Sequence, residues 1–330
     1  MTAATVPNKT SASASPANFE IESVSISGCP MQFPSIQVES SAILSSATGP
    51  SRTVRYTSTS THVKRSADGS LRVTPSQKEY LLQVPVARPG RVGLMLVGWG
   101  GNNGSTLTAS LLAHQHNVTW KSRRGVEKPN FYGSLVMAST VTLGNDEDTG
   151  KEVTAPMFQL APFVDPKNLV VGGWDISAMN LSAACDRAQV LEPTLIEKLA
   201  CHMQQLKPLP SIYDPTFIAS NQSDRADNVI PGSKSEQLEQ VRKDIRDFKA
   251  ANELEEVIIL WTANTERYTK VEVGIHDTWA NLEAAISSNH SEISPSTLFA
   301  VASILEGSAF INGSPQNTFV PGKLKRNVLT

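Results

Sequence analysis

A stretch of seven residues, GWGGNNG at positions 98–104, follows an apolar run and precedes a helical pattern. Gly98 and Gly100 match the first two glycines of the dinucleotide-binding pattern G-x-G-x-x-G, which allow a tight turn and a close approach of the backbone to a pyrophosphate. The third glycine comes one residue late, at Gly104, and Asn103 stands in its place. Because asparagine tolerates left-handed backbone conformations and offers amide donors, we interpret the stretch as a pyrophosphate-binding loop. A tight strand-to-helix turn without a ligand is the alternative.

The same pattern calls for an acidic residue about 20 positions further on, which hydrogen-bonds to the ribose hydroxyls. Residues 110–126 contain no Asp or Glu, so this partner must come from elsewhere in the chain. Asp175 is the best substitute, because it ends a later predicted strand. It could equally be the N-cap of the helix that follows, so both roles stay open.

Three further loops of unusual composition follow predicted strands, at residues 172–175, 262–267 and 312–318. In open α/β sheets, ligands bind beyond the carboxyl ends of the strands, where such loops lie. The polar groups of 262–267 suit hydrogen bonds to a nucleotide, or else an N-cap network with a Glu266–Arg267 pair. The amides and hydroxyls of 312–318 suit a polyhydroxylated or phosphorylated ligand, with structural asparagine turns as the alternative.

The elements that must position these loops alternate between strands and helices from residue 91 onwards, which is typical of an α/β fold with a mainly parallel sheet. We predict strands at 92–97, 168–171, 256–261 and 309–311, the second one broken by Gly172 and Gly173. Helices are predicted at 105–114, 179–189, 233–252 and 294–307, with further ones opening at Pro193 and at an Asp277 cap.

Two of these helices carry explicit start signals. Ser233 and Glu236 have the spacing of a capping box, and apolar residues recur through the helix that follows. Ser294 and Pro295 form an N-cap followed by proline at the first helical position. Before about residue 87 the chain is rich in serine and threonine, and we expect a disordered tail and a small, irregular β segment there, with a strand at 80–84.

Composition excludes several classes of function. The net charge of −2 gives no electrostatic case for nucleic acid or an anionic membrane, and no apolar run is long enough to span a bilayer. The three cysteines lack metal-ligand or disulfide-framework spacing and are expected as free thiols, which favours a cytoplasmic location. The six histidines make no metal pattern either, and His114 and His116 are expected in solvent near a helix end.

Long strings of the sequence resemble the eukaryotic inositol-3-phosphate synthases. They are VGWGGNNGST (97–106), NFYGS (130–134), GWDIS (173–177), LWTANTERY (260–268) and NGSPQNTFVPG (312–322). The resemblance runs almost continuously from about residue 87 to 322. It implies a Rossmann-like domain that binds NAD, in which the additional asparagine of the glycine loop is a family feature.

The resemblance also implies a set of cofactor contacts. The implied NAD-binding residues are Gly101, Asn102, Asn103, Gly104, Asp175, Ser211, Ile212, Gln222, Arg225, Thr262, Ala263, Asn264, Thr265, Gly313 and Ser314.

The activity that the resemblance implies is the isomerisation of D-glucose 6-phosphate to 1D-myo-inositol 3-phosphate, for inositol and phospholipid biosynthesis. In that reaction NAD takes a hydride from C5, enolisation and aldol closure form the ring, and the hydride returns. The family also implies a homotetramer. No metal site is expected in this chain.

The sequence departs from the family at its end. In relatives, the VPG motif continues into a catalytic and oligomerisation region that carries the essential lysines, and this region is largely absent here. No catalytic residue is therefore assigned. The expected segments are a tail at 1–20, a β segment at 21–87, the NAD-binding domain at 88–322 and a divergent tail at 323–330. A catalytically inactive NAD-binding fragment or isoform is the alternative to an active enzyme.

Overall fold

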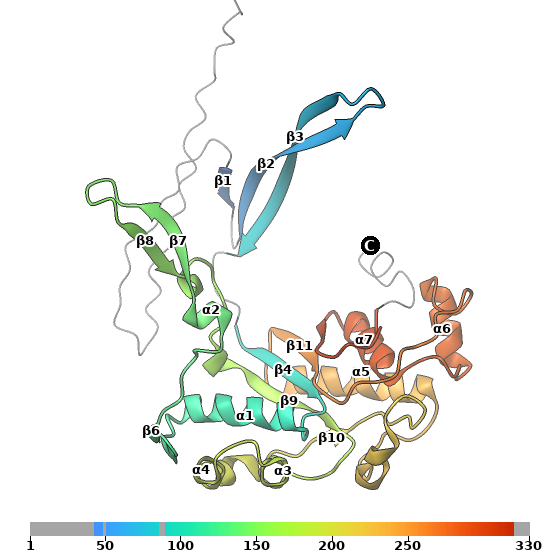
Figure 1. The fold of residues 1–330 in the computed structure, drawn as a ribbon. Coiled ribbons are helices and arrows are strands. Elements are labelled where there is room, and N and C mark those ends of the chain that lie inside the picture. The colour runs from blue at the N-terminus through green and yellow to red at the C-terminus, as the bar shows by residue number, and fades with distance from the viewer. Residues whose placement is uncertain (1–42, 49–50, 86–89, 320–330) are drawn as a thin grey trace, which may run out of the picture. The chain divides into compact units, whose positions relative to one another are not determined.

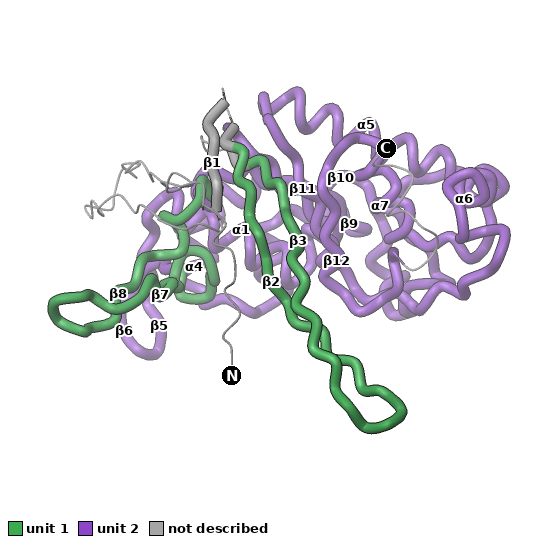
Figure 2. The backbone as a smooth tube through the Cα atoms, turned by 90° about the horizontal axis from the view of Figure 1, so that it is seen from above, with its two compact units in different colours: residues 1–88, 131–163 green, residues 89–130, 164–330 purple. Residues whose placement is uncertain are grey.

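The computed structural model describes residues 43–48, 51–85 and 90–319 (Figure 1). The chain divides into two compact units, the first made of residues up to 88 together with 131–163, the second of residues 89–130 and those from 164 onwards (Figure 2). The expected tails at 1–20 and 323–330 lie outside the described residues. The domain boundaries at 88 and 322 stay predictions.

The second unit is built on a five-stranded sheet in which every neighbouring pair is parallel, in the order β10-β9-β4-β11-β12. The central strand β4 comes first in the sequence. The next two strands, β9 and β10, lie on one side of it, and the last two, β11 and β12, lie on the other. This order confirms the predicted α/β, Rossmann-like fold. The strands are β4 (Val92–Val97), β9 (Val170–Asp175), β10 (Leu209–Pro210), β11 (Glu256–Trp261) and β12 (Ala309–Asn312).

Helices cover both faces of this sheet (Figure 1). Three of them pack on one face: α1 (Asn102–Gln115), α3 (Leu181–Ala188) and α4 (Pro193–Met203). On the other face lie α5 (Lys234–Ala251), α6 (Trp279–Ser287) and α7 (Pro295–Leu305).

The central strand β4 shows why the sheet needs both layers. Leu96 belongs to the apolar core shared with α1, α3 and α4, whereas Met95 and Val97 belong to the core shared with α5 and α7. All three side chains are buried. Because successive side chains of a strand point to opposite faces, an uninterrupted apolar run is what a strand buried on both faces requires.

The predicted helix starts at Ser233 and Ser294 are confirmed. The Ser233 hydroxyl accepts from the Glu236 amide and the Glu236 carboxylate accepts from the Ser233 amide, so the capping box is complete. Ser294 accepts from the amide of Thr297, with Pro295 at the first helical position. At α6 the expected cap was wrong, because Thr278 caps the helix while Asp277 accepts from the side chain of Asn281.

The prediction that Gly172 and Gly173 break the second strand was wrong, since β9 runs through both. A Cβ at Gly173 would lie 2.1 Å from the carbonyl oxygen of Leu96, and one at Gly172 would lie 2.6 Å from the ring of Phe248. Gly172 therefore allows the ring of Phe248 to pack closely on the sheet, and Gly173 allows the close approach of β9 to the backbone of β4. Gly173 also has a positive φ of 148°, a region that other residues rarely adopt.

His114 also departs from expectation. It is buried at 6% exposure, and its Nε2 lies 3.1 Å from the carbonyl oxygen of Asn130. His116 is exposed, as expected, and stacks on His202 with ring centroids 3.9 Å apart. Among the described residues Cys185 and Cys201 are free thiols. No helix in the described part of the chain has the length and apolar character needed to cross a membrane.

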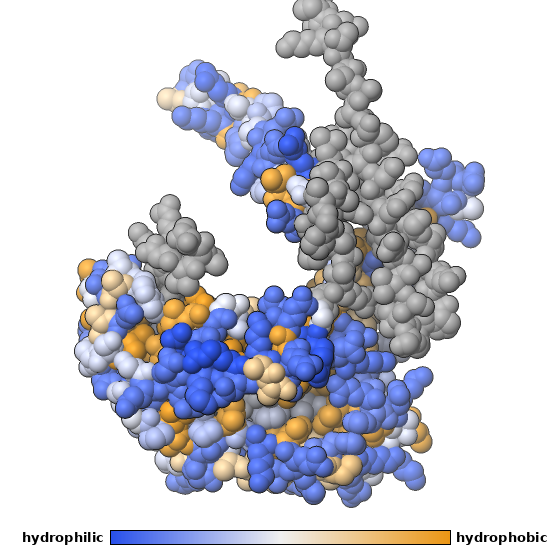
Figure 3. Space-filling model, turned by 180° about the vertical axis from the view of Figure 1, so that it is seen from behind, coloured by the Kyte–Doolittle hydropathy of each residue, from blue (hydrophilic) through white to orange (hydrophobic). Residues whose placement is uncertain are grey.

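The first unit contains the expected small N-terminal β segment. Its antiparallel sheet consists of β1 (Ile43–Thr48), β2 (Ser51–Arg65) and β3 (Leu71–Pro85), so the strand expected at 80–84 is part of a much longer one. The surface of the β2–β3 hairpin is mainly hydrophilic, with a few apolar side chains between the polar ones (Figure 3).

The remaining elements are short. The first unit also holds α2 (Leu135–Ala138), the β7–β8 hairpin (Thr140–Asn145 and Glu152–Pro156) and η1 (Met157–Gln159). The second unit adds the β5–β6 hairpin (Trp120–Ser122 and Gly125–Glu127), η2 (Pro166–Asn168) and η3 (Ser220–Arg225).

Candidate functional site

The turn between β4 and α1 depends on two glycines and on hydrogen bonds from its first residues. The amides of Gly98 and Trp99 both donate to the carbonyl oxygen of Trp174, at 2.8 and 2.9 Å. Gly98 has a φ of +86°, and a Cβ there would lie 2.6 Å from the Cα of Ala263. A Cβ at Gly104 would lie 2.4 Å from the carbonyl oxygen of Trp99. Only glycine fits at either position.

Because this turn directly follows β4, the N-terminus of α1 lies at the carboxyl edge of the sheet. The N-cap is Gly101, which has no side chain to cap the first turn, and the first turn contains no acidic residue. The backbone N–H groups there, together with the positive end of the helix dipole, form a site suited to an anion.

Asn102 and Asn103 are the first residues of α1. Neither uses the left-handed conformation that asparagine tolerates, since neither has a positive φ. Both residues are exposed.

Asp175 ends β9 beside this turn and is only 3% exposed. Its Oδ1 accepts from the amide of Ser177 at 3.0 Å, and burial raises the pKa of its carboxyl group. A Cβ placed on Gly100 would lie 3.3 Å from its Oδ2, so the glycine turn runs directly past the carboxylate. The alternative that Asp175 caps the next helix was wrong, because Asn180 caps α3.

The segment after β10 lies next to Asp175. Asn228 connects the two, since its side chain donates to the carbonyl oxygen of Asp175 at 3.0 Å and its own carbonyl accepts from the amide of Ser211. Ile212 is buried in the core of the α5–α7 face. In η3, Arg225 donates to Gln222 at 3.0 Å, and its Nη2 lies 3.9 Å from Asp175 Oδ1.

The loops after β11 and β12 are joined to the same edge. Thr262 donates to the carbonyl oxygen of Val97 through both its amide, at 2.9 Å, and its hydroxyl, at 3.0 Å. The hydroxyl of Ser314 donates to the carbonyl oxygen of Ala263 at 3.3 Å, and the amide of Gly313 to that of Trp261. Asn264 and Thr265 follow in the same loop. The expected cofactor residues therefore lie on the loops at the carboxyl ends of the five parallel strands.

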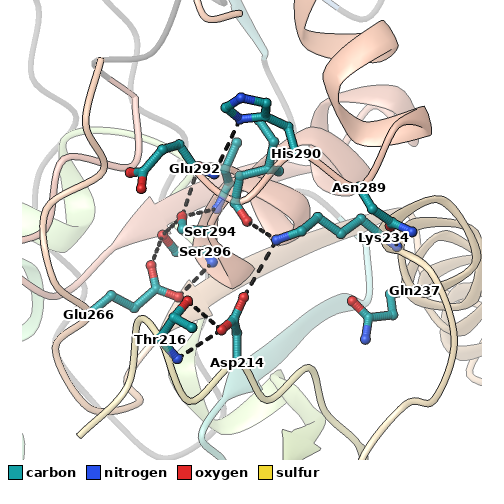
Figure 4. A network of polar contacts seen from close by, with 12 residues as sticks. Asp214, Thr216, Lys234, Gln237, Glu266, Asn289, His290, Glu292, Ser294 and Ser296 are labelled. Atoms are coloured by element: carbon teal, nitrogen blue, oxygen red, sulfur yellow. Dashed lines mark hydrogen bonds and ion pairs between the residues drawn. The ribbon is translucent and has the colours of Figure 1, made fainter. Parts of the chain in front are cut away.

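Glu266 follows the β11 loop and is buried at 2% exposure (Figure 4). Its carboxylate accepts from the amide and from the hydroxyl of Ser296, at 2.9 and 2.6 Å, at the N-terminus of α7. Burial raises the pKa of this carboxyl to about 7. The Glu266–Arg267 pair considered from the sequence does not form, because Arg267 binds Glu292 through two nitrogens, at 2.9 and 3.0 Å.

Ser296 also connects Glu266 to the last loop, because its hydroxyl lies 2.9 Å from that of Thr318. The loops after β11 and β12 thus share one anchor at the start of α7. Near this anchor, a cavity of about 200 Å³ lies between the N-termini of α5 and α7, lined by Ile212, Lys234 and Asn289 among others. Lys234 reaches toward Asp214, with 3.5 Å between Nζ and Oδ2 (Figure 4).

Sequence reasoning missed Arg187. This side chain extends from α3 to the glycine turn, where its Nη2 donates to the carbonyl oxygen of Gly100 at 2.8 Å. Nothing in the sequence distinguishes it from a surface arginine on an amphipathic helix. Within the described ranges, no group of three or more His, Cys, Asp or Glu side chains is arranged to hold a metal ion.

Comparisons with known proteins agree with this geometry. An NAD-binding family model described as myo-inositol-1-phosphate synthase matches residues 92–327. Inositol-3-phosphate synthase of Drosophila melanogaster is 53% identical over 273 residues, which are 83% of this chain and 48% of that protein. Inositol-3-phosphate synthase 1 of Rattus norvegicus is 55% identical over 271 residues, or 82% and 48% of the two chains.

The crystal structure of inositol-3-phosphate synthase from Caenorhabditis elegans superposes with a TM-score of 0.81 at 49% identity, covering 86% of this chain and 55% of that one. The chain thus spans about half the length of the curated relatives it matches. The glycine turn, the order of the parallel strands and the match over residues 92–327 lead to the same conclusion: the chain belongs to the inositol-3-phosphate synthase family and contains its NAD-binding region.

Proposed function

We propose that this chain binds NAD along the carboxyl edge of its parallel sheet and serves an enzyme that converts D-glucose 6-phosphate to 1D-myo-inositol 3-phosphate. One observation carries the proposal: the uncapped N-terminus of α1 and the carboxylate of Asp175 lie on either side of the turn at Gly100. An anion-binding helix terminus and a ribose-binding carboxylate beside one glycine turn are the two parts that a dinucleotide site needs.

The proposed roles follow from position. The N-terminal residues of α1, from Gly101 to Gly104, hold the pyrophosphate, and Asp175 accepts hydrogen bonds from the ribose. Arg225 lies next to Asp175 and donates to Gln222, so both belong to the ribose end of the proposed site. The loops at 262–265 and 313–314 lie beyond β11 and β12, toward the other half of the dinucleotide.

Bound NAD would supply reversible hydride transfer. This chain's own residues orient the dinucleotide and surround it with loops that are anchored to one another. No catalytic acid or base is assigned to the described residues. Glucose 6-phosphate as substrate, a homo-oligomeric assembly and a cytoplasmic location remain part of the proposal.

Calorimetric titration of the purified chain with NAD tests the cofactor site. The test variant is Gly100→Ala, whose added Cβ would lie 3.3 Å from the Asp175 carboxylate, a contact that a small shift relieves. We expect the variant to fold and to bind NAD at least about tenfold more weakly, because the methyl group occupies the space between the turn and the ribose site. Gly133→Ala is the matched control, since a Cβ there meets nothing within 4 Å. Equal NAD affinity of Gly100→Ala and Gly133→Ala would refute the site.

An end-point assay tests the reaction. The chain is incubated with glucose 6-phosphate and NAD, and inositol phosphate is quantified chemically. Product formation without accumulation of NADH supports the isomerase. NAD binding without any product identifies the chain as a cofactor-binding module that does not turn over.

A further inference from the structure

Two arginines and one carboxylate meet beside the glycine turn. Arg187 comes from α3, Arg225 from η3 and Asp175 from the end of β9. Arg225 Nη2 lies 3.9 Å from Asp175 Oδ1, while Arg187 donates to the carbonyl oxygen of Gly100 at 2.8 Å. Three separate elements thus bring three charges to the ribose end of the proposed site.

These three charges do not balance one another. Burial lowers the pKa of Arg187, the positive charge of Arg225 lowers it further and the carboxylate of Asp175 raises it, so the two guanidinium groups repel each other. One carboxylate therefore faces two cations. The excess positive charge favours an additional anion at this point.

Two buried donors of these guanidinium groups are also unsatisfied. Arg187 Nη1 and Arg225 Nε have no hydrogen-bond partner among the residues that the structure describes. A buried N–H group of a charged side chain without a partner costs free energy, which an acceptor with negative charge would recover. Phosphate is such an acceptor, and guanidinium groups bind it through two parallel hydrogen bonds.

We propose that Arg187 and Arg225 form a subsite for the 2′-phosphate of a dinucleotide, and that the carboxylate of Asp175 excludes this phosphate and so sets the preference for NAD over NADP. The inference rests on the proposed NAD binding. In dinucleotide folds a carboxylate at this place binds the free ribose 2′-hydroxyl, whereas an arginine accommodates a 2′-phosphate. Here both kinds of group are present, and Asp175 lies within the electrostatic reach of both arginines.

The test compares affinities for NAD and NADP, measured by calorimetry on the full chain. Asp175→Asn removes the negative charge but keeps an oxygen that can accept from the Ser177 amide, so the turn is preserved. We expect this variant to shift the ratio of NADP to NAD affinity at least about tenfold toward NADP. Adding Arg187→Met is expected to abolish the shift.

The matched control is Arg124→Met in the same Asp175→Asn background, because Arg124 is an exposed cation in the β5–β6 turn. Arg124→Met removes one positive charge, as Arg187→Met does. The shift in affinity toward NADP is expected to remain in this control. An unchanged ratio in Asp175→Asn would overturn the proposal, as would a shift that survives Arg187→Met. Asp175→Ala, which also removes side-chain volume, serves if the Asn variant does not fold.

A second probe separates this inference from the proposed function. Adenosine 2′,5′-bisphosphate and 5′-AMP differ only in the 2′-phosphate and need neither pyrophosphate nor nicotinamide contacts. Failure of the unaltered chain to bind NAD would refute the proposed function. Preference of Asp175→Asn for the bisphosphate, lost on Arg187→Met, would still support the subsite, and its absence would overturn it.

Discussion

Replacement of Glu266 by glutamine should remove a pH dependence of stability that is unusual for a carboxyl group. Glu266 is buried at 2% exposure, and its pKa is raised from 4.5 to about 7. Between these two pH values the folded chain holds a proton that the unfolded chain has released. Stability therefore falls as pH rises from about 4.5 to about 7, and is constant with respect to this group above that range.

The size of the effect follows from the shift. The pKa of Glu266 is about 2.5 units higher in the folded chain, at about 7, than the ordinary value of 4.5. At about 1.4 kcal/mol per pKa unit, this difference changes the free energy of unfolding by about 3 kcal/mol. The hydrogen bonds from Ser296 are already included, because they lower the pKa and oppose the burial that raises it. Glutamine keeps a carbonyl oxygen for the Ser296 amide and carries no charge.

Urea unfolding at pH 5, 7 and 8 measures this difference. We expect Glu266→Gln and the unaltered chain to have similar free energies of unfolding at pH 5, and the variant to be more stable by up to about 3 kcal/mol at pH 8. Glu283→Gln, which neutralises an exposed carboxyl group on α6, is the control and should leave the pH profile unchanged. Parallel pH profiles for Glu266→Gln and the unaltered chain would refute the reasoning.

Three further substitutions test the fold. Ser233→Ala removes the capping box of α5 and should lower the free energy of unfolding by about 1 kcal/mol in urea titrations. Leu199→Ala empties a fully buried position on α4 and should lower it by about 2–5 kcal/mol, with a cost below about 1 kcal/mol arguing against the core described here. Gly173→Ala, whose Cβ would lie 2.1 Å from the oxygen of Leu96, should lower the melting temperature far more than Gly133→Ala does, and equal melting temperatures would contradict the close approach of β9 to β4.

The sheet was predictable from the sequence wherever local signals and tertiary demands agree. β4 and β11 are uninterrupted apolar runs, and both occur at the expected residues. The second strand was predicted to end at Val171, before Gly172, because glycine is interpreted locally as a break. Its real role depends on the ring of Phe248 and the backbone of Leu96, which come from other parts of the chain.

The candidate site divides in the same way. In the glycine turn and in the loops after β11 and β12, the unusual residues are neighbours in the sequence. These three segments could therefore be recognised from the sequence alone. Arg187 could not, because its reach to Gly100 depends on how α3 packs beside α1. The anchor between Glu266 and Ser296 joins residues that are 30 positions apart, and the neighbouring Arg267 offered a simpler but wrong partner.

The position of β4 at the centre of the sheet has a consequence for the time course of synthesis. Val92 pairs with Glu256, so the β11 edge of β4 has no native partner until a further 164 residues (256 − 92) have been made. At about 5–20 residues per second, this takes roughly 10 to 30 s. Throughout that interval one edge of an apolar strand lacks its native partner, and such an edge is a template for pairing with other chains.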